Sequence, residues 1–121
     1  MAILITGGTG FIGSHTVVEL LNDGRDVVIL DNLSNSKECV IDRIETITGK
    51  RPKFYNADLL DYEAVDRVFN ENDIDSVIHF AGLKAVGESV AQPIRYYHNN
   101  LTGTLILCEV MAKHNVKRII F

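Results

Sequence analysis

The stretch ILITGGTGFIGSH, residues 3–15, decides the fold of this chain. An apolar run stops at a cluster of glycines and an amphipathic segment follows, which predicts a strand, a tight turn and the start of a helix. Gly7, Gly10 and Gly13 lack a Cβ atom, so they tolerate positive φ and let the backbone approach a ligand closely. The helix would point its unpaired N–H groups and the positive end of its dipole at the turn, which suits a bound diphosphate.

The glycines fit two known spacings. Gly8-x-Gly10-x-x-Gly13 is typical of long-chain dehydrogenases, and Gly7-x-x-Gly10-x-x-Gly13 of short-chain ones. Dinucleotide binding also requires an acidic residue about 20 positions further on, and Asp31 supplies it. The stretch alone leaves both spacings open, together with a plain turn that binds no ligand.

Composition narrows the class of protein. The chain has 121 residues, which fits one domain, and its 46% hydrophobic content is enough to bury a core. The net charge of −4, with acids and bases interspersed, argues against a nucleic-acid-binding surface. No apolar run approaches the roughly 18 residues of a membrane span. Neither Cys39 and Cys108 nor the histidines have metal-ligand spacing, so we expect no metal site, no disulfide and a reduced, cytoplasmic setting.

Short apolar strands alternate with longer helical patterns along the chain. Strands are predicted at residues 2–6, 27–30, 53–56, 76–80 and 116–121. Helices are predicted at about 11–23, 36–48, after a cap at Asp61, and at 93–115. This alternation predicts an α/β fold, a three-layer Rossmann-type doubly wound parallel sheet of order 3-2-1-4-5. We expect a ligand at the carboxyl ends of the strands, where the order reverses between strands one and four.

Helical periodicity also indicates which side chains face inward. Four apolar residues of each of the first three helices share a face: Ile12, Val17, Leu20 and Leu21; Val40, Ile41, Ile44 and Ile47; Ala64, Val65, Val68 and Phe69. In the last helix, Leu101, Leu105, Cys108 and Ala112 keep helical spacing.

The loops after the strands carry the candidate chemistry. Asp31 can accept hydrogen bonds from both hydroxyls of an adenosine ribose and would repel a 2′-phosphate, which favours NAD over NADP. Asp58 can reach the adenine amino group while Leu59 packs on the ring, although an Asx turn leading to the Asp61 cap explains Asp58 equally well. Lys84 would be a cation near diphosphate, ribose or substrate. His79 is interpreted as a packed residue at a strand end.

Four motifs resemble a known family. TGGTGFIG at 6–13 is similar to the glycine fingerprint of the extended short-chain dehydrogenase/reductases, and the loops after strands two and four select its Gly7 spacing. DNLSNS at 31–36 and HFAGLKAVGES at 79–89 are similar to the UDP-sugar 4-epimerases of that family, and YYHNN at 96–100 continues the pattern. Related dehydratases and decarboxylases usually differ in the loop after strand four.

The resemblance implies tightly bound NAD that takes a hydride from C4 of a UDP-sugar and returns it to the other face of the 4-keto sugar. It implies diphosphate, ribose and adenine contacts, and then contacts along the rest of the NAD path and to the sugar. The residues implied for the diphosphate are Gly7, Gly10, Phe11, Ile12 and Gly13, and those for the ribose are Asp31, Asn32, Asn35 and Ser36. Asp58 and Leu59 are implied for the adenine. The rest of the NAD path would be lined by Phe80, Ala81, Gly82, Lys84 and Asn99, and the sugar would be faced by Lys84 and Val86.

One family feature is missing. The general base of the family is a Tyr with a Lys four residues later, and none of the four tyrosines here has one. We therefore expect residues 1–121 to be the incomplete NAD-binding domain of a longer enzyme, without its sugar-nucleotide domain and inactive alone. Alternatives are a stand-alone NAD-binding module, or another nucleotide-sugar epimerase or dehydratase. We also expect self-association or a homodimer.

Overall fold

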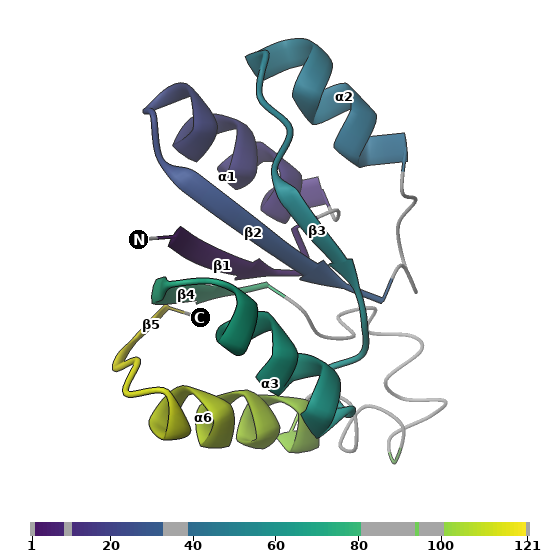
Figure 1. Cartoon of the computed structure of the whole chain (residues 1–121). Coiled ribbons are helices and arrows are strands. Elements are labelled where there is room, and N and C mark those ends of the chain that lie inside the picture. Colours follow the sequence, from purple (N-terminus) through teal and green to yellow (C-terminus); the bar gives the residue numbers. More distant parts are fainter. Residues whose placement is uncertain (1, 9–10, 33–38, 81–93, 95–100, 121) are drawn as a thin grey trace.

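The central feature of the computed structural model is a five-stranded parallel sheet; residues 2–8, 11–32, 39–80, 94 and 101–120 are described. Its order is β3-β2-β1-β4-β5, as predicted (Figure 1). The strands are β1 Ala2–Thr6, β2 Asp26–Asp31, β3 Lys53–Asn56, β4 Ile74–His79 and β5 Arg118–Ile120. Because β1 pairs with both β2 and β4, the carboxyl ends of these three strands meet at one edge of the sheet.

Helices cover both faces of the sheet, which gives the predicted three layers (Figure 1). The helices are α1 Phe11–Asn22, α2 Cys39–Thr48, α3 Tyr62–Glu71 and α6 Gly103–Lys113. Successive strand residues point to opposite faces. Leu4 of β1 therefore packs in the layer of α3 and α6, whereas its neighbour Ile5 packs in the layer of α1 and α2.

Most predicted boundaries are confirmed to within two residues. Asp61 caps α3, because its Oδ1 accepts a hydrogen bond from the Ala64 N–H at 3.3 Å. β4 begins two residues earlier than predicted, at Ile74, and ends at His79. α6 ends at Lys113, two residues before the predicted end.

Two apolar residues predicted to face inward are exposed instead. Ile12 in the first turn of α1 is 59% exposed, and Ile47 in the last turn of α2 is 67% exposed. The prediction was wrong for both because periodicity gives the direction of a side chain, not how far its helix overlaps the sheet. Val17 and Ile44, nearer the middles of the same helices, are fully or almost fully buried.

The last helix buries a different face from the one with the regular apolar spacing. Its buried residues are Gly103, Leu107, Val110 and Met111. The set with the regular spacing, Leu101, Leu105, Cys108 and Ala112, lies on the outside, and we call it the outer stripe of α6. None of the helices in the described ranges has the length and apolarity needed to cross a membrane.

Candidate functional site

The glycine turn between β1 and α1 forms one wall of the candidate site. Gly7 adopts φ 72°, a conformation that disfavours any residue with a Cβ atom. A Cβ atom on Gly13 would lie 2.2 Å from the Gly7 carbonyl oxygen, so only glycine lets α1 begin this close to the turn. These two positions belong to the predicted spacing. Gly10 and the Phe11 side chain lie outside the described residues, and Ile12 is exposed on the first helical turn.

The carboxyl end of β2 supplies the acidic residue. Asp31 is the last residue of the strand, with 9% of its surface exposed, and its backbone oxygen accepts a hydrogen bond from the Ala57 N–H at 3.2 Å. The next residue, Asn32, donates from Nδ2 to Asp58 Oδ2 at 3.5 Å. This contact joins the loop after β2 to the loop after β3. Asn35 and Ser36 lie outside the described residues.

Asp58 has a structural role in its own loop. Its Oδ1 accepts a hydrogen bond from the Leu60 N–H at 3.0 Å, and its backbone oxygen accepts one from the Asp61 N–H at 2.9 Å. This Asx turn, one of the two interpretations of the sequence, is confirmed. Leu59 is 9% exposed and packs in the core, and a Cβ atom on Gly103 of α6 would lie 3.2 Å from Leu59 Cβ. Adenine contacts of both residues stay predictions.

The end of β4 joins the site to β1 and α6. The Phe80 N–H donates to the Thr6 carbonyl at 2.9 Å, and Phe80 packs in the layer of α1 and α2. His79 is 8% exposed, as expected of a packed residue, and its two ring nitrogens are hydrogen-bonded to the hydroxyls of Thr6 and Thr104. The remaining predicted contacts, Ala81, Gly82, Lys84, Val86 and Asn99, lie outside the described residues.

The sequence reasoning singled out neither Thr6 nor Thr104. A usable signal was present for Thr6, because the predicted strands 2–6 and 76–80 are neighbours in the predicted order. In the structure Thr6 and His79 are register partners on these two strands. Thr104 had no such signal, since its contact with His79 depends on how α6 docks on the sheet.

The described residues at this edge fit a dinucleotide. The turn presents backbone without side chains at Gly7 and Gly13, which suits a diphosphate close to the amino end of α1. A buried carboxylate stands at the end of the adjacent strand β2, where a ribose would lie. The arrangement can therefore hold the phosphates and the adenosine half of such a cofactor.

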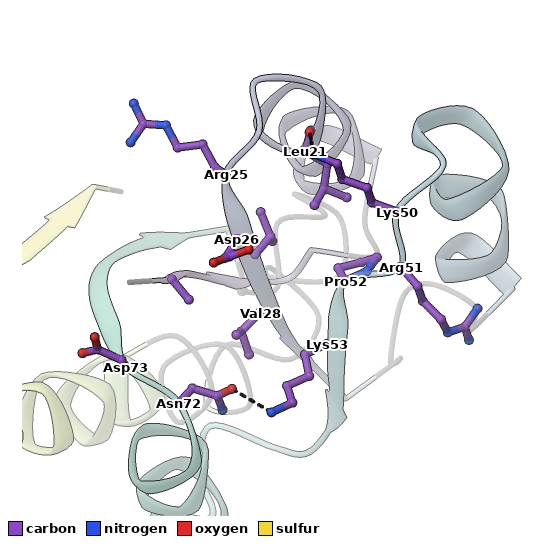
Figure 2. A pocket seen from close by; sticks show the side chains of 12 residues that line it. Leu21, Arg25, Asp26, Val28, Lys50, Arg51, Pro52, Lys53, Asn72 and Asp73 are labelled. Atoms are coloured by element: carbon purple, nitrogen blue, oxygen red, sulfur yellow. Dashed lines mark hydrogen bonds between the residues drawn. The ribbon is translucent and has the colours of Figure 1, made fainter.

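A pocket lies at the opposite end of the sheet from the candidate site, among the amino ends of the strands (Figure 2). This cavity of about 550 Å³ includes Lys50 and Lys53 in its wall. Lys50 Nζ donates to the Leu21 carbonyl at 3.2 Å, and Lys53 Nζ donates to Asn72 Oδ1 at 3.2 Å. Arg25 and Arg51 point away from its centre (Figure 2). Because its cations do not converge on one point, we assign no ligand to it.

Comparison with known proteins identifies the family. The NAD dependent epimerase/dehydratase family matches residues 3–121. The chain belongs to this family. Its members depend on NAD, in agreement with the cofactor predicted from the glycine turn and Asp31.

Individual members of the epimerase/dehydratase family match along the whole chain. The UDP-glucose 4-epimerase of Bacillus subtilis (strain 168) is 69% identical over 121 residues, which is 100% of this chain and 36% of that protein. The structure of UDP-glucose 4-epimerase from Bifidobacterium longum in complex with NAD+ and UDP has a TM-score of 0.98 and 60% identity, covering 100% of this chain and 36% of that one. The chain therefore spans about 36% of the length of such relatives.

A third relative was solved with a sugar nucleotide. The structure of UDP-glucose-4-epimerase from Stenotrophomonas maltophila holds NAD and formylated UDP-arabinopyranose. It has a TM-score of 0.95 and 44% identity, and the match covers 98% of this chain and 35% of that one.

Proposed function

We propose that this chain is the NAD-binding part of a UDP-glucose 4-epimerase, which interconverts UDP-glucose and UDP-galactose. One observation carries the proposal: the chain matches the Bifidobacterium longum enzyme, solved with NAD+ and UDP, along its whole length with a TM-score of 0.98 and 60% identity. In this proposal residues 1–121 form an incomplete Rossmann domain, and the sugar-nucleotide domain belongs to a further part of the protein.

The cofactor contacts follow the edge of the sheet. Gly7, Gly13 and the amino end of α1 would hold the diphosphate, since backbone N–H groups and the helix dipole favour an anion there. The Asp31 carboxylate would accept hydrogen bonds from both ribose hydroxyls, which a 2′-phosphate on NADP would oppose by charge repulsion. Further contacts are proposed for Gly10, Phe11, Ile12, Asn32, Asn35, Ser36, Asp58, Leu59, Phe80, Ala81, Gly82, Lys84 and Asn99, with Lys84 and Val86 facing the sugar.

The chemistry divides between this chain and the rest of the enzyme. NAD+ held by these residues would supply a reversible hydride acceptor for C4 of the sugar, so that the overall reaction has no net redox change. The residues of this chain bind and orient the cofactor. Proton transfer from the sugar hydroxyl needs a base, and the residues four positions after the tyrosines are Leu59, Asp66, Asn100 and Leu101. The 121-residue chain alone is therefore expected to be inactive.

A turnover assay tests the activity. The full-length protein that carries this chain should convert UDP-galactose to UDP-glucose in a coupled assay, while the 121-residue chain should not. Absence of turnover in the full-length protein would contradict the proposed activity, and turnover by the short chain would refute its inactivity.

Replacement of Asp31 tests the cofactor contact. In the full-length protein, Asp31→Ser should weaken NAD+ binding at least about tenfold, equivalent to about 1.4 kcal/mol, and reduce the preference over NADP+. Asp26→Ser is the matched control, because Asp26 begins the same strand and is exposed at its far end. Cofactor titrations of both variants decide the point, and equal effects of the two substitutions would exclude a ribose contact at Asp31.

A second substrate class is favoured by one observation. The Stenotrophomonas maltophila relative was solved with formylated UDP-arabinopyranose, so another UDP-sugar is the alternative substrate. Turnover of a panel of UDP-sugars by the full-length protein separates the two. A stand-alone NAD-binding module is the remaining alternative, and it predicts NAD+ binding without turnover of any UDP-sugar.

We propose in addition that the protein is a homodimer. The support is the outer stripe of α6, in which Leu101 and Leu105 are 53% and 54% exposed beside exposed Cys108 and Ala112. Its spacing of four, three and four residues matches the a/d seam of paired helices. A cytoplasmic location is also proposed, because Cys39 and Cys108 are exposed free thiols.

A further inference from the structure

We infer that His79 is a positioning residue for the cofactor, because its imidazole connects Thr6, the residue before the glycine turn, to Thr104 in the first turn of α6. This inference rests on the proposed NAD binding, and it concerns a side chain that the proposed cofactor contacts do not include.

The three side chains form a hydrogen-bonded chain across three elements. His79 Nδ1 lies 2.5 Å from Thr6 Oγ1, and His79 Nε2 lies 3.0 Å from Thr104 Oγ1. Thr6 is fully buried and His79 is 8% exposed. A neutral imidazole offers one donor and one acceptor, and a hydroxyl can act as either, so both contacts are satisfied in either tautomer.

The apolar surroundings of His79 make its two hydrogen bonds necessary. Leu4 and Val77, two residues before Thr6 and His79 on their strands, are fully buried in the same layer, as is Leu107 one turn after Thr104. A polar side chain in such surroundings costs free energy unless it is hydrogen-bonded. The ring of His79 is therefore held in one orientation by the two hydroxyls.

The position of this chain links it to the candidate site. Thr6 is followed directly by Gly7, whose φ of 72° sets the glycine turn and whose carbonyl oxygen abuts Gly13. The backbone of Thr6 is already fixed to β4 by the hydrogen bond from the Phe80 N–H at 2.9 Å. The contact from His79 adds a side-chain restraint to the last residue before the turn. We expect this restraint to preorganise the turn for the diphosphate.

Three substitutions of His79 separate its hydrogen bond to Thr6 from its hydrogen bond to Thr104. His79→Asn places an amide near the Nδ1 position and keeps the hydrogen bond to Thr6. His79→Gln reaches the Nε2 position and keeps only the hydrogen bond to Thr104. His79→Leu removes both. In the full-length protein freed of cofactor, His79→Leu and His79→Gln should raise the NAD+ dissociation constant at least tenfold, and His79→Asn less than threefold.

Unfolding midpoints of the cofactor-free variants give the second readout. A purely structural role predicts that NAD+ affinity falls in step with the midpoint for all three variants. Positioning predicts that His79→Asn restores affinity even when its midpoint stays low. Equal dissociation constants for His79→Asn and His79→Gln would overturn the inference.

Replacement of either threonine partner provides a second test if the His79 variants do not fold. Thr6→Val should raise the dissociation constant at least tenfold and Thr104→Val less than threefold, since only Thr6 borders the turn. Equal effects of the two substitutions would overturn the inference. Failure of the unchanged protein to bind NAD+ would instead reject the proposed function.

Discussion

At the scale of single residues, the glycine turn shows two different needs for the same residue type. Gly7 requires a backbone conformation with positive φ. Gly13 requires space, because an added Cβ atom would lie 2.2 Å from a backbone oxygen that cannot swing aside like a side chain. The spacing of the glycines in the sequence reflects a conformational constraint at one position and a packing constraint at the other.

Gly13→Ala should therefore damage both the fold and cofactor binding. Relief of the clash has to move α1 away from the turn, at a cost of about 1–3 kcal/mol or more, typical of overpacking. Gly24→Ala is a useful control, since Gly24 has φ +81° but no atom within 4 Å of an added Cβ atom. Its cost should be about 1–2 kcal/mol from backbone strain alone, with NAD+ affinity unchanged. Denaturant unfolding and NAD+ titration give both quantities, and a loss of affinity in Gly24→Ala equal to that in Gly13→Ala would contradict the packing argument.

At the scale of elements, a charged cluster joins the two helices on one face of the sheet. Asp66 of α3 accepts hydrogen bonds from His114 Nε2 at 2.7 Å and from Lys113 Nζ at 3.0 Å, both at the end of α6. The His114 ring also stacks on Phe69 of α3, with ring centroids 5.6 Å apart. The bond from His114, and then that from Lys113, lowers the pKa of Asp66 below its ordinary value of 3.8.

This lowered pKa predicts how stability changes in acid. The Asp66 carboxylate binds protons less readily in the folded than in the unfolded state, so its contribution is present above the ordinary value of 3.8 and is lost as pH falls through the folded pKa. Asp66→Asn should lower the unfolding midpoint at pH 6, and the difference from the unchanged protein should shrink below pH 4. Asp75→Asn is the control, because the Asp75 carboxylate lies 4.0 Å from a largely exposed Arg118. A difference for Asp66→Asn that stays constant from pH 6 to pH 3 would contradict this role of the carboxylate.

At the scale of the whole molecule, the buried and exposed faces of α6 have different partners. Leu107 and Val110 are fully buried against α3 and the sheet. Leu105 and Leu101 expose about half of their surface on the outer stripe. Large apolar side chains gathered on an exposed helix face are typical of an interface, which is the basis of the proposed homodimer.

Leu105→Glu should convert the proposed dimer to monomer, since it places a charge in the middle of the outer stripe of α6. Its fold should be retained, because Leu105 is 54% exposed. Ile47→Glu on α2 is the matched control, an exposed isoleucine away from the stripe, and should leave the dimer intact. Sedimentation of the full-length variants measures the difference, and a monomeric unchanged protein would contradict the proposed assembly.

The predictions that were confirmed depend on signals that are local in the sequence. Strand and helix alternation gave the order β3-β2-β1-β4-β5, and the turn residues around Gly7 and Asp61 marked where helices begin. Asp31 was placed at the end of β2 by the same alternation. Ile12 and Ile47 are exposed, contrary to the prediction, because their burial depends on which neighbours lie beyond the ends of their own helices.

The sequence by itself determined the family of fold, the glycine turn and the acidic residue of the candidate site, because each follows from residues close together in the chain. Only the tertiary structure decided which face of α6 is buried. It also fixed the contact of His79 with Thr104 on a separate helix, whereas the contact of His79 with Thr6, 73 positions away, joins two strands already predicted to be neighbours. The physical reason is that periodicity within an element sets the direction of its side chains, whereas contacts between distant elements set which of those side chains are buried.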